Sequence, residues 1–177
     1  MNNKKHTKKG FTLVELVIVI AIIGILTMIV MVAWNRVINR QRLTDANQRA
    51  KVIFNAAQTE CIKYSTTERN LDPDERYVGT GDFYLYWNGG SASSGDAANN
   101  TPHADVNDTR FAAAINRILA ENGTYKVYIR DYVVQSVVYQ ERANNRYMGA
   151  YPAQRSDITN DTVAACSNMV QYAQLVH

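Results

Sequence analysis

One carboxylate lies inside a long apolar stretch near the start of the chain. From Phe11 to Ala33 almost every side chain is hydrophobic, and Glu15 carries the only charge. Charged groups are rare in such stretches and mark functional sites by default. An apolar environment disfavours the charged form of a carboxylate, whereas an ammonium fixed within about 4–6 Å restores it. Glu15 is therefore predicted to act by pairing with a cation, and a buried pair of this kind can set a register.

The apolar stretch is long enough to hold this carboxylate in a membrane-spanning helix. At about 1.5 Å per residue it makes a helix of roughly 35 Å, compared with about 30 Å for a bilayer core. Lys4, Lys5, Lys8 and Lys9 precede it, and such a cluster favours a cytoplasmic N-terminus. A cleaved secretory signal has a shorter apolar region, and a plain membrane anchor leaves Glu15 unexplained.

The sequence Lys-Lys-Gly-Phe-Thr-Leu-Val-Glu-Leu at 8–16, followed by the apolar stretch, resembles the N-terminus of type IV pilins and pseudopilins. In that family a membrane peptidase cuts after the glycine and the new N-terminal residue is methylated. The resemblance thus implies cleavage between Gly10 and Phe11, with N-methylation of Phe11. It also implies assembly through Glu15, which would lie near the Phe11 amine of a neighbouring subunit.

The resemblance also implies how the chain of 177 residues is organised. Residues 1–10 would be a cytoplasmic leader that is removed, and 11–33 the transmembrane and filament-core half of a long helix. Residues 34–66 would be the amphipathic half of that helix, and 67–177 a globular head. The chain would be in the bacterial cell membrane before assembly, with its N-terminus cytoplasmic. Afterwards it would be in an extracellular pilus or a periplasmic or wall-spanning pseudopilus.

The partners implied by the resemblance are those of filament assembly. They are copies of the chain and related pilins, the prepilin peptidase and N-methyltransferase, the assembly ATPase with its membrane platform proteins, and membrane lipids before assembly. No nucleic-acid partner is expected. The net charge of +3 includes four leader lysines, and without them the side chains sum to −1, which argues against a bulk electrostatic partner.

Helical spacing continues beyond the apolar stretch. Apolar residues recur every three or four positions and so share one helix face: Ala46, Ala50, Ile53, Ala57, Cys61 and Tyr64. This face is predicted to pack on a domain. The fold class expected is α+β and pilin-like, with the long N-terminal helix packed on a small antiparallel sheet with short helices.

The rest of the chain alternates between β-rich runs and turn-rich segments. Strands are predicted at 83–87, 125–130, 132–140 and 146–151, the last three as an antiparallel meander. Residues 91–108 are predicted to be a loop because they are rich in Ser, Gly, Asn and Asp. Helices are predicted from Asp108 or Thr109 up to Gly123, and at the C-terminus from Asp161 to Val176.

Two cysteines, Cys61 and Cys166, fall in a region expected to lie outside the cytoplasm, where disulfides persist. A bridge between them would close a loop of about 100 residues, worth roughly 4–5 kcal/mol in the chain-entropy model. We expect this bridge to tie the C-terminus to the long helix. The alternative is two buried free thiols, which behave as small hydrophobic residues.

The chain contains no GxSxG, P-loop, HExxH or GxGxxG motif. The three histidines, His6, His103 and His177, are far apart in sequence, and no Cys/His spacing suggests a metal. We expect no enzyme activity, cofactor or metal. The function expected is a structural subunit of a type IV pilus or pilus-like filament.

Two alternatives to the pilus subunit stay open. The first is a pseudopilin of a type II secretion or DNA-uptake system, which would share the same N-terminus. The second is a minor tip subunit for adhesion. The tip hypothesis predicts that aromatic residues such as Tyr84, Tyr86 or Trp87 are exposed together as a patch, since exposed aromatic rings can stack on sugars or bases.

Overall fold

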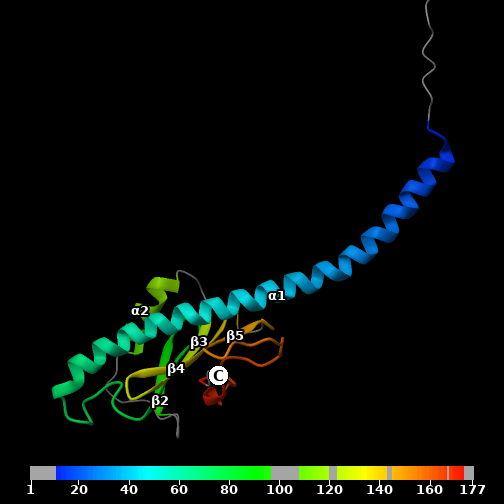
Figure 1. The fold of residues 1–177 in the computed structure, drawn as a ribbon. Helices are drawn as coiled ribbons and strands as arrows, with labels where there is room; N and C mark the ends of the chain where they lie inside the picture. The colour runs from blue at the N-terminus through cyan, green and yellow to red at the C-terminus, as the bar shows by residue number, and fades with distance from the viewer. Residues whose placement is uncertain (1–10, 97–107, 120–122, 143–144, 167, 174–177) are drawn as a thin grey trace, which may run out of the picture. The chain divides into compact units, whose positions relative to one another are not determined.

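A computed structural model of the protein describes residues 11–96, 108–119, 123–142, 145–166 and 168–173. The chain divides into two units, Met1–Arg40 and Gln41–His177. One helix, α1 (Leu13–Thr67), contributes residues to both units (Figure 1). The remaining described elements all belong to the second unit: η1 (Glu68–Asn70), β1 (Asp82–Trp87), β2 (Ala92–Asp96), α2 (Asp108–Leu119), β3 (Thr124–Arg130), β4 (Val133–Gln140), β5 (Met148–Tyr151) and η2 (Met169–Tyr172).

The five strands form one antiparallel sheet in the order β2-β1-β3-β4-β5. The hairpin between β3 and β4 turns at Asp131 and Tyr132, whose φ angles are 51° and 64°. Positive φ at both central residues is the geometry that matches the twist of paired strands. A long N-terminal helix followed by this sheet and short helices makes the protein α+β, as predicted.

The part of α1 after Arg40 covers one face of the sheet. Ala50, Ile53 and Ala57 are fully buried and belong to one cluster with side chains of β1, β3 and β4. The backbones of α1 and β5 approach closely, because a Cβ atom at Gly149 would overlap the backbone of Ala46. The predicted packing of the apolar stripe on a sheet is confirmed.

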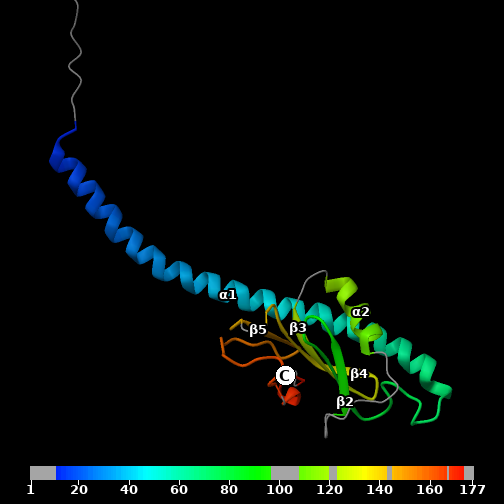
Figure 2. The same cartoon turned by 180° about the vertical axis from the view of Figure 1, so that it is seen from behind.

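α2 lies beside the C-terminal part of α1, as both views show (Figures 1 and 2). Its buried residues Phe111 and Ile115 join the same hydrophobic cluster. The Phe111 ring stacks on Tyr64 of α1 with 5.5 Å between ring centroids. The short helix predicted after residue 108 is therefore present, and it completes the cover over this face.

The segment after β5 packs on the opposite face of the sheet. Val163, Met169 and Tyr172 are buried there against residues of β3, β4 and β5. The helix predicted from Asp161 to Val176 is wrong in its described part, where the only helix is the single turn η2. Sheet side chains take up carbonyl groups of the segment instead: Ser136 Oγ donates to Met169 O at 2.8 Å, and Lys126 Nζ donates to Cys166 O at 2.9 Å.

The amide of Asn47 ties α1 to the chain after β5. This side chain is only 5% exposed. Its Oδ1 accepts from the backbone N–H groups of Ala150 at 2.9 Å and Arg155 at 3.3 Å, and its Nδ2 donates to Arg155 O at 2.8 Å. The buried amide thus makes three of its four possible hydrogen bonds. Asn47 thus makes the connection to α1 that the sequence analysis assigned to a disulfide.

Candidate functional site

The first turn of α1 is closed by reciprocal hydrogen bonds between Thr12 and Glu15. Thr12 donates to Glu15 Oε2 from both its backbone N–H and its hydroxyl, each at 2.9 Å, and the Glu15 N–H donates to Thr12 Oγ1 at 3.3 Å. This is a capping box, the pattern Ser/Thr-x-x-Glu at a helix start. Thr12 is therefore a site residue that the sequence analysis missed, although Thr-Leu-Val-Glu carried the signal.

The capping box fixes the direction of the Glu15 carboxylate. Both bonds from Thr12 end on Oε2, and no described residue donates to Oε1. The carboxylate therefore lies at the N-terminal end of α1, where the helix dipole favours negative charge. It keeps accepting capacity for a donor from another chain. Phe11, immediately before the cap, is 86% exposed.

The leader falls outside the described residues, so the structure places neither its lysines nor Gly10. The cleavage between Gly10 and Phe11 and the methylation of Phe11 therefore stay predictions. The pairing of Glu15 with a neighbouring amine also stays a prediction, because the structure holds one chain.

The helix that follows the cap is apolar all round. Every side chain described between Phe11 and Val37 is exposed. Thr27 satisfies its hydroxyl within the helix by donating to Ile23 O at 2.7 Å, a bond that hides a polar group in apolar surroundings. This is the one described helix long and apolar enough to cross a membrane by length and composition. A helix without a polar face needs lipid or other helices around it.

The two cysteines are not paired, so the predicted disulfide is wrong. Cys61 is buried in the cluster between α1 and the sheet, whereas Cys166 packs against the cluster on the opposite face. The sheet itself therefore lies between them. Burial raises the pKa of the Cys61 thiol to about 12, so this thiol stays protonated and behaves as a small hydrophobic residue.

The aromatic residues of β1 point to opposite faces of the sheet. Tyr84 and Tyr86 are half-buried on the face away from α1, and Tyr84 stacks on Tyr128 with 4.9 Å between ring centroids. Trp87 packs on the α1 face, where its ring lies 6.5 Å from Tyr125. The three rings therefore do not form the single patch that the tip hypothesis would favour.

Comparison with known proteins finds one match. Residues 5–31 match the prokaryotic N-terminal methylation motif, which includes the capped helix start and most of the apolar stretch. No curated protein and no solved structure matches the chain. This chain therefore carries, at its N-terminus, the class III signal of type IV pilins and pseudopilins.

Proposed function

We propose that this chain is a structural subunit of a type IV pilus or pilus-like filament, and that it has no catalytic role. The proposal rests on one observation: the apolar stretch forms a helix that begins with a capping box. Glu15, the only charged residue of that stretch, is held in the first turn. Such a helix needs apolar neighbours along its length and a cation at its start. Copies of the processed chain would supply both.

Maturation would create the cation. Cleavage between Gly10 and Phe11 removes the leader 1–10 and leaves an ammonium on Phe11, directly before the cap residue Thr12. In a staggered array, the Phe11 amine of one subunit would meet the Glu15 carboxylate of the next. Two opposite unit charges about 4 Å apart attract each other far more strongly in an apolar surrounding than in water. Each carboxylate in the array would pair with one amine.

The rest of the chain then has the expected organisation. Residues 11–33 would be in the membrane before assembly and in the filament core afterwards. The peptidase, the assembly ATPase and its platform proteins would act on the chain at the membrane. The sheet and its covering segments would form the exposed head of the filament, with the amphipathic half of α1 as its support.

The alternative is a pseudopilin of a secretion or DNA-uptake system, because the methylation motif is common to both classes. Electron microscopy of sheared surface material separates them. Long fibres that contain this chain support the pilus subunit. A chain that stays with the envelope, in short assemblies only, supports the pseudopilus. Adhesion at a filament tip has weaker support, since Trp87 lies on the other face from Tyr84 and Tyr86.

Two substitutions at Glu15 separate pairing from capping. Glu15→Ala removes both the charge and the acceptor for Thr12, whereas Glu15→Gln keeps a carbonyl acceptor for the cap and removes only the charge. If charge pairing drives assembly, both variants are processed and stay in the membrane, but fibre yield falls sharply in both. Glu60→Gln, at a half-buried position of the same helix outside the apolar stretch, is the matched control and should assemble normally.

Fibre yield measured in sheared fractions decides the outcome. Normal fibres from Glu15→Gln would refute the pairing role and leave Glu15 a capping function only. Normal fibres from both Glu15 variants would remove the argument for assembly through this residue altogether.

A further inference from the structure

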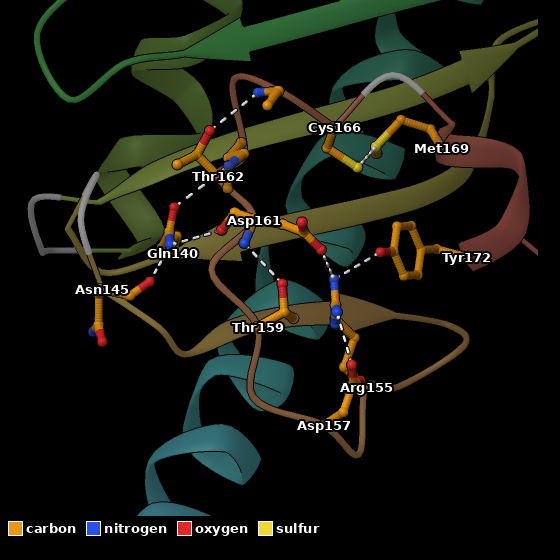
Figure 3. Close-up of polar contacts among 12 residues, drawn as sticks. Gln140, Asn145, Arg155, Asp157, Thr159, Asp161, Thr162, Cys166, Met169 and Tyr172 are labelled. Carbon is orange, nitrogen blue, oxygen red and sulfur yellow. Dashed lines mark hydrogen bonds and ion pairs between the residues drawn. The ribbon is translucent and has the colours of Figure 1, made fainter.

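Two sulfur atoms are in contact in the segment after β5, which packs on the face of the sheet opposite α1. Cys166 Sγ and Met169 Sδ lie 3.8 Å apart (Figure 3). Met169 is fully buried and Cys166 is half-buried, so the pair is at the boundary between the core and the surface. Lys126 and Ser136 hold the two backbone carbonyls of this pair from the sheet below, which fixes where the segment lies.

A cavity opens beside the pair. It has a volume of about 180 Å³ and is lined by Cys166, Met148, Asp161, Tyr172 and neighbouring residues. Met148 is 1% exposed and belongs to the same buried cluster as Met169. Met148 therefore places a third sulfur-bearing side chain on the wall of the cavity that Cys166 also lines. The cavity also gives a small ion a path from solvent to Cys166.

The kinds of donor atom restrict the ligand. No group of three or more His, Cys, Asp or Glu side chains able to hold a metal occurs among the described residues, which argues against a zinc or calcium site there. Thiolate and thioether sulfur together select soft ions such as Cu(I). With metal–sulfur bonds of about 2.3 Å, a separation of 3.8 Å corresponds to an angle of roughly 110° at the metal.

We propose that Cys166 and Met169 form a binding site for a soft monovalent cation, Cu(I), with Met148 as a third sulfur ligand. Binding replaces the thiol proton with the metal: the S–H bond breaks, the proton leaves to solvent, and a sulfur–metal bond forms without any change of oxidation state.

The second cysteine of the chain is a built-in control. Cys61 is fully buried in the other cluster, on the far side of the sheet. It has no methionine among the residues of that cluster. If any cysteine thiol could bind the metal, Cys61 and Cys166 would differ only in their access to solvent. The proposed site, in contrast, also depends on Met169.

The test uses the full chain in detergent with Ag(I), a soft monovalent ion that needs no reductant. Native mass spectrometry should find one Ag(I) per wild-type chain, and one equivalent should protect Cys166 from iodoacetamide. Cys166→Ser should lose the ion, while Cys61→Ser should keep it. Met169→Leu, which keeps the hydrophobic volume, should need at least about tenfold more Ag(I) for the same protection. Loss of a group that only hydrogen-bonds to a metal ligand already lowers metal affinity by about 10–100-fold, and loss of a ligand should cost at least as much.

Four results would overturn the site. The first two are a wild-type chain that binds no Ag(I) and a Cys166→Ser chain that still binds one. The third is Met169→Leu protected at the same Ag(I) concentration as wild type, which would reduce the site to a single thiol. The fourth is equal protection by Zn²⁺, which would contradict the assignment to a soft ion.

Discussion

Replacing Glu68 with alanine should destabilise the globular unit by about 3–5 kcal/mol, because this carboxylate organises the loop between α1 and the sheet. Glu68 is 3% exposed. Its Oε1 accepts from the N–H groups of Tyr77 at 3.0 Å and Val78 at 3.3 Å. Its Oε2 accepts from the N–H of Gly79 at 3.2 Å and from the hydroxyl of Tyr132 at 2.8 Å.

The magnitude follows from the donors left behind. Each buried donor without a partner costs about 1–3 kcal/mol. Tyr77 and Val78 are buried, so their N–H groups lose the carboxylate acceptor without gaining water, while Gly79 and Tyr132 are half-exposed and can turn to water. The full penalties for the two buried N–H groups and the small ones for the two half-exposed groups add up to the predicted loss of stability. Glu68→Gln keeps one carbonyl oxygen and should cost about half as much.

Urea unfolding of the full chain in detergent, followed by near-ultraviolet circular dichroism, measures the loss. Amide hydrogen exchange locates it, and the exchange of residues 77–79 should accelerate most. Glu60→Gln is the control, because Glu60 is half-buried and pairs with the exposed Lys63, and a helix pair of this kind is worth no more than about 0.5 kcal/mol. An unfolding midpoint for Glu68→Ala equal to that of Glu60→Gln would refute the role assigned to Glu68.

Two further predictions concern the polar ties of the same unit. Asn47→Ala should cost about 2–4 kcal/mol in the same urea assay, since it leaves the buried Ala150 N–H and the Arg155 backbone without their partner; the exposed Asn55→Ala should be neutral, and equal costs would contradict the assignment. Burial and then the bond to Glu68 raise the pKa of Tyr132 to about 12, from 10. Its stabilisation is therefore present below pH 10 and lost as the pH rises through 12. Tyr132→Phe should flatten this alkaline loss of stability, and an unchanged pH profile would contradict the cause.

Much of the fold could be predicted because its signals are local. Apolar residues recur every three or four positions along α1, and the apolar and aromatic runs of β1, β3, β4 and β5 are bounded by turn residues. β2 was missed because Ala92–Asp96 is rich in small polar residues that carry no strand signal. It is a strand because β1 offers it a free edge, and this is a tertiary cause.

The C-terminal segment shows the same limit. Val163, Met169 and Tyr172 point into the core without forming a regular helix, because side chains of the sheet hold the carbonyl groups of the segment. Helical spacing alone could not predict these partners. The same spacing placed Cys166 on an inward face, which is correct, but nothing local shows that this face meets the other side of the sheet from Cys61.

At the candidate site, the charge of Glu15 was visible in the sequence because it stands alone among apolar residues. The role of Thr12 was also encoded locally, in a capping pattern of four residues. Asn47 could not be found in this way, because its partners Ala150 and Arg155 are about one hundred residues away in the chain. A polar residue on an apolar helix face only weakens the amphipathic pattern and does not indicate what it binds.

The central claim is that the chain is a processed filament subunit, and the intact mass of the chain in cell-derived filaments tests it most directly. Filaments sheared from the surface, or purified from the envelope, should contain a chain that begins with N-methylated Phe11 and has lost the leader 1–10. A chain in those filaments that retains Lys4–Lys9, or one that begins after Ala33, would contradict the account.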